Sequence, residues 1–136
     1  MISNALMCLV VAMGGNSVLV ARCSASMTPT PLYVRLAHVS LPDNNTPYGK
    51  ATRRNLRDLC LNKVAEIVPR SIDIDGLTLA DVRCGETSAQ QYLISQGLAQ
   101  VKQPISPEDT GLLKLQMLAQ QRKLGQWQAD TLASRP

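Results

Sequence analysis

Several residue types are scarce in this chain, and each scarcity narrows the range of functions. The 136 residues include no phenylalanine, three tyrosines and one tryptophan. A single-strand binder that stacks bases on aromatic rings needs more of them on its surface. His38 is the only histidine and no Cys-x-x-Cys pair occurs, which argues against a zinc site. The apolar run from Ala5 to Met13 is well short of the roughly 20 residues of a membrane-spanning helix, so no such segment is predicted.

What remains is the composition of a folded globular domain. Hydrophobic residues make up 45% of the chain and charged residues 18%, which argues against disorder. The length predicts a single domain over residues 1–136, with a core from about 6 to 128 and a short tail at 129–136. Fourteen Lys and Arg against ten Asp and Glu give a net charge of +4. This mild excess permits a polyanionic partner without requiring one.

The N-terminal segment "CLVVAMGGNSVLVARC" consists of two β-branched runs around Gly14-Gly15-Asn16. This pattern predicts a β-hairpin. A cleaved leader is the weaker interpretation, because no Lys or Arg precedes the apolar run. The given chain therefore shows no clear signal peptide.

Four cysteines, Cys8, Cys23, Cys60 and Cys84, are spread through the chain. As two disulfides, in any of three connectivities, they would place the protein in an oxidising, extracytoplasmic compartment. As four small buried thiols they would fit the cytoplasm. The sequence leaves both alternatives open.

The periodicity predicts strands first and then helices. The five predicted strands are Leu6–Met13, Ser17–Cys23, Leu32–Leu41, Val64–Val68 and Leu77–Cys84, with a turn-rich connector at Ser24–Pro31. Three helices are predicted: one from about Gly49 to Leu61, one from Thr87 to an exit at Gly97, and one that runs to about Leu124. The third begins with Ser106 as its cap, Pro107 at the first position and Asp109 three residues after the cap, as in a capping box. This order indicates a small closed β-barrel with helices against it.

The first predicted helix has two distinct faces. Leu56, Leu59 and Cys60 form an apolar stripe. The other side carries four basic residues at helical spacing, Lys50, Arg53, Arg54 and Arg57. A solvated surface and a nucleic-acid-binding face are both consistent with this pattern.

At this point a series of short motifs resembles the staphylococcal nuclease-like (thermonuclease) family. The third predicted strand and its end, Val34-Arg35-Leu36 to Pro42-Asp43, are similar to the family's Val-Arg-Leu-x-x-Ile-Asp-x-Pro-Glu. Further matches follow in order: Tyr48-Gly49, the Asp73–Leu77 turn, Gly97-Leu98-Ala99-x-Val101 and Gly125-x-Trp127. The resemblance runs from about Cys8 to Trp127. It implies an α+β fold, a five-stranded OB-type barrel with three α-helices.

The resemblance also implies a site, and most of its chemistry is replaced here. The family cleaves phosphodiesters with one Ca²⁺ held by two aspartates, a glutamate near the water and two arginines. Arg35 matches the first arginine, and Asp43 stands at the glutamate position. The remaining positions are substituted: Asn16 and Ser40 replace the metal aspartates, Leu77 the second arginine and Asp75 the turn tyrosine.

We therefore expect a catalytically degenerate domain without calcium or another cofactor, acting as a binding or interaction module. The partner would be an unidentified protein, or nucleic acid bound through Lys50, Arg53, Arg54 and Arg57. A nuclease with relocated ligands, drawn from Asp43, Asp73, Asp75 and Asp81, is the remaining alternative. Arg35 is expected to pair with Asp43 or Asp75. His38 is expected to be half-buried and not to act as a catalytic base.

Overall fold

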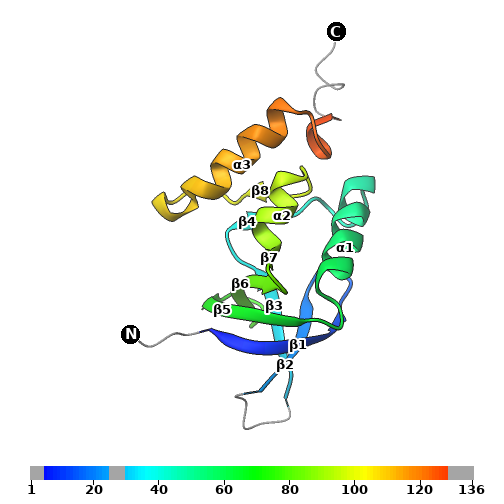
Figure 1. The fold of residues 1–136 in the computed structure, drawn as a ribbon, viewed down its shortest axis with the longest axis vertical. Helices are drawn as coiled ribbons and strands as arrows, with labels where there is room; N and C mark the ends of the chain where they lie inside the picture. Colours follow the sequence, from blue (N-terminus) through cyan, green and yellow to red (C-terminus); the bar gives the residue numbers. More distant parts are fainter. Residues whose placement is uncertain (1–4, 25–29, 129–136) are drawn as a thin grey trace. The chain divides into compact units, whose positions relative to one another are not determined.

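The structure is a computed structural model that describes residues 5–24 and 30–128 (Figure 1). Most of the predicted connector after Ser24 and the predicted tail at 129–136 lie outside the described residues. The chain forms two compact units: residues 1–37 with 55–89, and residues 38–54 with 90–136. Among the described residues, every helix is too short or too polar to cross a bilayer.

A closed five-stranded barrel makes up the first unit. Its strands follow the order β3-β2-β1-β5-β6, and a parallel pairing of β3 with β6 closes the ring. Closure removes the unpaired edges that an open sheet would expose. The strands are β1 (Leu6–Met13), β2 (Leu19–Cys23), β3 (Leu32–Leu36), β5 (Val64–Ile72) and β6 (Thr78–Cys84). The predicted barrel is confirmed.

Alternate residues of each strand point into the barrel. Val10, Leu19, Val34 and Ile67 are fully buried, and their neighbours along the strands are more exposed. Because side chains alternate with a period of two, a strand of this kind has one apolar face. Val18 is only half-buried, because this alternation turns it away from the face that carries the fully buried Leu19.

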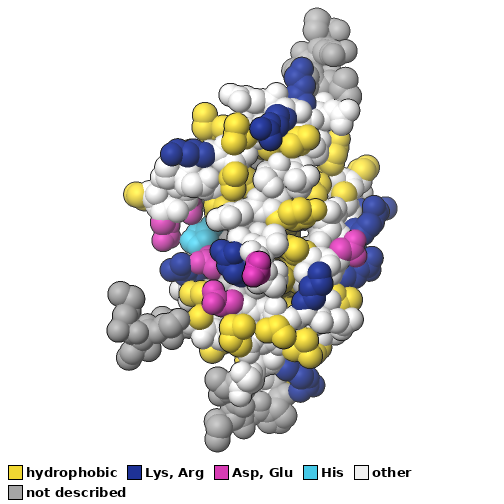
Figure 2. Space-filling view, viewed as in Figure 1, with side chains coloured by type: hydrophobic (Ala, Val, Ile, Leu, Met, Phe, Trp, Pro, Cys, Tyr) yellow, Lys and Arg dark blue, Asp and Glu magenta, His cyan; other side chains and the backbone are white. Residues whose placement is uncertain are grey.

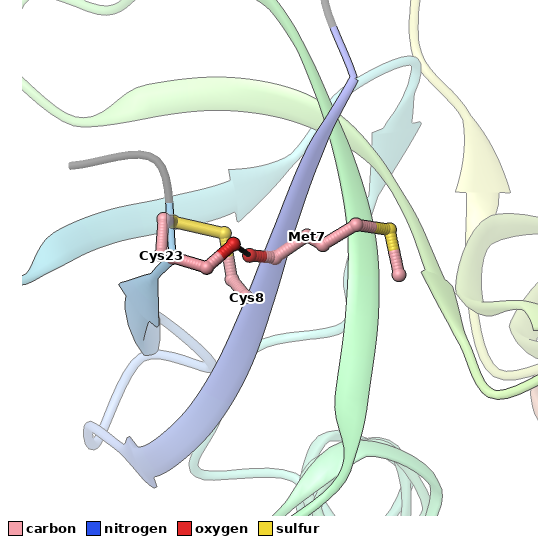
Figure 3. The surroundings of a disulfide bond; sticks show 4 residues. Met7, Cys8 and Cys23 are labelled. Carbon is pink, nitrogen blue, oxygen red and sulfur yellow. Dashed lines mark hydrogen bonds between the residues drawn. A yellow bond between two sulfur atoms is a disulfide. The ribbon is translucent and has the colours of Figure 1, made fainter.

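Two disulfides fasten this unit. Cys8 and Cys23 face each other across the β1–β2 ladder, and Cys60 is bonded to Cys84. Figure 3 shows the first bridge beside the hydrogen bond that the Ser24 hydroxyl donates to the Met7 carbonyl oxygen, at 3.4 Å. All four cysteines are therefore paired, which leaves no free thiol.

The third strand is shorter than predicted. β3 ends at Leu36, and after a break at Ala37 and His38 the chain resumes as β4 (Val39–Ser40), which pairs with β8 (Gln100–Val101). His38 has φ of +71°, in the left-handed region that non-glycine residues rarely enter. The prediction of one strand through Leu41 was wrong because alternation alone does not reveal such a break.

Helix α1 (Pro47–Cys60) begins two residues before its predicted start. Thr46 caps it by accepting the Gly49 N–H on its hydroxyl oxygen at 3.0 Å, and Pro47 suits the first helical position. Gly49 leaves room for the preceding turn, because a Cβ there would lie 1.9 Å from the carbonyl oxygen of Asp43. The glycine of the Tyr48-Gly49 motif is therefore required because no side chain fits at that position.

The second unit contains two further helices, α2 (Ala89–Ser95) and α3 (Thr110–Gln121), and α3 lies beside β8 (Figure 1). A 3₁₀ turn, η1 (Pro107–Asp109), precedes α3. The predicted capping box of Ser106 and Asp109 is present there. The predicted start of the second helix at Thr87 was wrong, because Thr87 and Ser88 form strand β7 against β6.

Buried polar contacts and close backbone approaches stabilise this unit. The buried Thr52 hydroxyl lies 2.8 Å from the Tyr48 carbonyl oxygen and 2.7 Å from that of Leu98. Gly97 has φ of +73°, and a Cβ there would lie 2.1 Å from the Leu124 carbonyl oxygen. Gly125 also lies close to this segment: a Cβ there would lie 2.3 Å from the Gly97 carbonyl oxygen.

Candidate functional site

Arg35, the residue that the resemblance matches to the family's first arginine, already has an anionic partner. It lies in β3, and its Nη1 donates a hydrogen bond to Asp73 Oδ2 at 3.1 Å. The Arg35 side chain is 38% exposed and that of Asp73 is 14% exposed. A charge-assisted pair in such a half-buried place is stronger than one at the open surface. The sequence predicted Asp43 or Asp75 as the partner, so the type of contact is right and the residue differs.

Asp73 also organises the turn between β5 and β6. Its Oδ1 accepts the backbone N–H groups of Asp75, at 2.9 Å, and Leu77, at 3.0 Å. Gly76 completes the turn with φ of +81°. The carboxylate thus holds three donors, one guanidinium and two backbone groups. Asp73 was predicted only as a member of this turn and as one candidate for a relocated metal ligand, and the Asx-turn pattern Asp-x-Asp-Gly was the available signal for its role.

Two further family positions lie on turns of the barrel. Asn16 is exposed in the β1–β2 turn, where Gly14 N–H donates to the Val18 carbonyl oxygen at 2.8 Å. Leu77 is half-buried directly before β6. The barrel therefore has a neutral amide at the position that the resemblance assigns to a metal aspartate, and an apolar side chain at the position that it assigns to the second arginine.

The remaining family positions belong to the second unit. Ser40 is exposed at the end of β4. The Asp43 carboxylate is exposed too, and its Oδ1 accepts the Asn45 N–H at 2.8 Å. The Asp43 carbonyl oxygen accepts from the Thr46 N–H at 3.0 Å. Both bonds serve the turn that leads into α1.

The four basic residues predicted on one face of α1 differ in their exposure to solvent. Lys50, Arg54 and Arg57 are exposed, and within residues 5–24 and 30–128 they form no ion pair. Arg53 is half-buried, and its Nε is buried without a hydrogen-bond partner among the described residues. Three of the four predicted residues are therefore available to an anionic ligand.

Asp81, one of the four candidates for a relocated metal ligand, is already paired with Arg70. The Arg70 Nε donates to Asp81 Oδ2 at 2.8 Å, and its Nη2 contacts the same oxygen. Asp81 also lines an open pocket of about 180 Å³ on the barrel, with Glu66, Val68, Val82, Arg83 and Ser88. Of the four predicted candidates for new metal ligands, Asp81 alone lines it.

His38 is half-buried as predicted, with its side chain 19% exposed; Figure 2 shows this ring, in cyan, at the surface. Its Nδ1 lies 3.2 Å from Oδ1 of the buried Asp109. Asp109 lies at the end of η1, and the exposed Glu108 precedes it. The sequence analysis missed this cluster, because nothing in the local patterns links position 38 to positions 108 and 109.

Comparison with known proteins agrees with the fold and the order of these motifs. The family model described as "Staphylococcal nuclease homologue" matches residues 33–129. The chain belongs to the staphylococcal nuclease homologue family. The match begins within β3, so the β1–β2 hairpin with Asn16 lies outside the matched range. A search of curated proteins finds no match.

The calcium site expected of a staphylococcal nuclease homologue can be tested against the donors present. Calcium prefers several oxygen ligands, and its affinity follows the number of charged ones. At the two metal positions this homologue offers the amide of Asn16 and the hydroxyl of Ser40, both neutral. The one carboxylate of the set, Asp43, accepts a backbone N–H of its own turn. These residues do not fit a calcium ion of the family type.

Proposed function

We propose that this staphylococcal nuclease homologue is a non-catalytic binding or interaction domain that has lost the calcium-dependent phosphodiester chemistry of its family. The observation that carries the proposal is the ion pair between Arg35 and Asp73. A phosphate at Arg35 would have to displace a carboxylate that is itself held by two backbone N–H groups. Phosphoryl transfer depends on cations placed around the developing charge.

The magnitudes support this proposal. Loss of a transition-state arginine lowers phosphoryl transfer by about 10³- to 10⁵-fold. Leu77 removes that charge, and the neutral Asn16 and Ser40 remove most of the attraction for a divalent cation. Such losses are not additive, but together they leave little of the family mechanism. The barrel remains as a scaffold, and OB-type barrels serve as binding platforms in many proteins.

Nucleic-acid binding without cleavage is the second candidate function. Lys50, Arg54 and Arg57 lie at positions i, i+4 and i+7 of α1, all exposed and without a carboxylate partner among the described residues. Such a face suits phosphates, which are contacted without sequence preference. The two disulfides are compatible with an oxidising compartment, and we propose an extracytoplasmic location on that ground.

The deciding experiment combines plasmid cleavage with a gel-shift assay on the same protein. Cleavage is measured in Ca²⁺, Mg²⁺ and Mn²⁺ and again with excess chelator. Binding of single- and double-stranded DNA is measured at two salt concentrations. No cleavage and no shift support an interaction domain with a protein partner, whereas a salt-sensitive shift without cleavage supports the second candidate. Cleavage that the chelator abolishes would overturn the non-catalytic proposal in favour of a rearranged nuclease.

A further inference from the structure

Three potential metal ligands meet in the second unit, and none of them is a position that the resemblance assigns to the family's calcium site. His38, Glu108 and Asp109 each present one ligand atom, an imidazole nitrogen or a carboxylate oxygen, and these atoms lie within 4.8 Å of one another. His38 comes from the break before β4, and the two acids come from η1. One nitrogen and two carboxylate oxygens form a donor set used by divalent transition metals.

Asp109 provides independent support for a ligand in this place. The residue is only 4% exposed. Its Oδ2 accepts the N–H and the hydroxyl group of Ser106, both at 3.1 Å. Its Oδ1 is buried and has no hydrogen-bond partner among the described residues. A buried carboxylate oxygen without a donor is unfavourable, so this atom calls for a cation.

The nearest group to that oxygen is His38 Nδ1, at 3.2 Å, a distance that brings the pair into ion-pair range but without hydrogen-bond geometry. Two donors bound to one tetrahedral Zn²⁺ at about 2.0–2.1 Å lie about 3.3 Å apart. The observed spacing of 3.2 Å is compatible with two ligands of one ion. The backbone holds His38 in position, because Lys102 N–H donates to its carbonyl oxygen at 2.9 Å.

The unusual backbone of His38 points the same way. Its φ of +71° lies in the left-handed region, which few non-glycine residues occupy, although histidine does so more often than most. Residues in such conformations cluster at ligand-binding positions. Here the conformation ends the barrel strand and leaves the ring beside Asp109.

We propose that His38, Glu108 and Asp109 form a site for a divalent transition-metal ion, with Zn²⁺ as the best fit. The imidazole favours Zn²⁺ over Ca²⁺ or Mg²⁺, which prefer oxygen ligands only. Three protein ligands leave one tetrahedral position for water. The ion would join the segment before β4 to the start of α3 and would stabilise the second unit, because a site formed only in the folded chain couples metal binding to folding. This site is separate from the calcium positions of the family and from the proposed function.

The test uses the full chain without a histidine tag, treated with chelator and dialysed. Zn²⁺ is titrated by calorimetry, and thermal unfolding is followed with and without the ion. One equivalent should bind, and the unfolding temperature should rise with Zn²⁺ concentration. Ca²⁺ should produce neither effect. Co²⁺ should give the visible absorption of a four-coordinate ion, and since the chain has one histidine and no free thiol, the imidazole resonances report directly on this site.

Two variants remove ligands with little risk to the fold. Glu108 is exposed, so Glu108→Gln deletes one charge and keeps the shape. His38→Gly removes the imidazole and places at φ of +71° the residue that accepts it best. Changes in the groups around a metal typically lower its affinity about 10- to 100-fold, so loss of a direct ligand should lower it at least about 100-fold. Glu86→Gln, an exposed acid in the β6–β7 turn, is the matched control and should bind Zn²⁺ as the parent does.

The outcomes separate cleanly. Stoichiometric binding that is lost in both variants and kept in the control supports the site. Absence of Zn²⁺ binding at millimolar concentration overturns it, and so does binding that both variants retain, because the ion would then lie elsewhere. In a crystal soaked with Zn²⁺, an anomalous peak within coordination distance of His38 Nδ1 supports the site, and a peak only at other residues contradicts it.

Discussion

Arg35 Nη1 lies 3.1 Å from Asp73 Oδ2, so the arginine of β3 is bound to a carboxylate of the turn between β5 and β6. The two residues are 38 positions apart in the chain. The pair connects β3 to the turn between β5 and β6, both within the barrel. This arrangement gives Arg35 a structural role that needs no substrate.

We predict that Asp73→Ala destabilises the protein more than Arg35→Ala does. Removing the carboxylate leaves the Asp75 and Leu77 N–H groups without their acceptor as well as Arg35 without its partner, at a cost of about 1–3 kcal/mol. Arg35→Ala removes one partly exposed ion pair and should cost no more than about 1 kcal/mol. Urea unfolding measures both, with the exposed Asp75→Ala as control, expected within about 0.5 kcal/mol of the parent. Equal losses for Asp73→Ala and Arg35→Ala would contradict the role of Asp73 in the turn.

The ion pair between Arg35 and Asp73 also leads to a prediction about DNA binding. If binding occurs, Arg35→Ala should leave it nearly unchanged, because the guanidinium is already neutralised by Asp73. Replacing Lys50, Arg54 and Arg57 by Glu should weaken binding and lower the log–log salt slope by up to about 2.7, for three lost phosphate contacts. Arg53 is kept in this triple variant because its Nε is buried.

Fluorescence anisotropy over a series of salt concentrations measures both variants. A matched control replaces three exposed basic residues elsewhere, Arg22, Arg83 and Lys114, by Glu, with the same change in net charge. Equal effects of the two triple variants would mean that net charge, not the α1 face, governs binding. Loss of binding in Arg35→Ala alone would show that the family's phosphate site still functions.

The barrel was predictable because local and long-range patterns agree. Gly14-Gly15-Asn16 between β-branched runs predicted the β1–β2 hairpin, and Ser106 with Pro107 and Asp109 predicted the start of the third helix. Such signals depend on residues close together in the chain, where turn and capping chemistry is fixed. Periodicity predicted the order of the elements, and the family motifs agreed with that order.

The break at His38 and the partner of Arg35 were not predictable in this way. Val34, Leu36 and His38 continue a strand alternation, and only the fold shows that the chain leaves the barrel with φ of +71° at His38. Nothing local distinguishes Asp73 from Asp75 as the partner of a distant arginine. The disulfide connectivity likewise depends on strand register, which places Cys8 directly opposite Cys23. All three depend on contacts between residues far apart in the sequence.

The close approach at Gly97 predicts a large effect of a single methyl group. Gly97→Ala should destabilise the protein by more than about 2 kcal/mol, because the side chain would combine a positive φ with a backbone clash at 2.1 Å. Gly111→Ala is the matched control: it lies in the first turn of α3, with nothing within 4 Å of its Cβ position. That change should stabilise by about 0.5–1 kcal/mol, through reduced freedom of the unfolded chain and better helix propensity. Thermal unfolding of the two variants should therefore shift in opposite directions, and shifts of the same sign would contradict the steric argument.

Calcium provides the last prediction, and it concerns the positions that lost their carboxylates. With neutral side chains at Asn16 and Ser40, the parent should bind no Ca²⁺ up to about 1 mM, the weak end of the range that calcium sites cover. Restoring the two acids, as Asn16→Asp with Ser40→Asp, should produce calcium binding detectable by calorimetry. Both chains carry Glu108→Gln in this experiment, so that the cluster around His38 does not contribute.

A charge-matched control separates a specific site from added negative charge. Asn62→Asp with Gln120→Glu introduces two carboxylates at exposed positions outside the family site and should bind no calcium. A gain confined to the Asn16/Ser40 pair means that the scaffold still presents the metal positions and that the loss of binding lies in those two side chains alone. Binding in the unaltered parent that Ser40→Ala abolishes would instead show that neutral oxygens suffice here, and the conclusion that these residues do not fit calcium would be wrong.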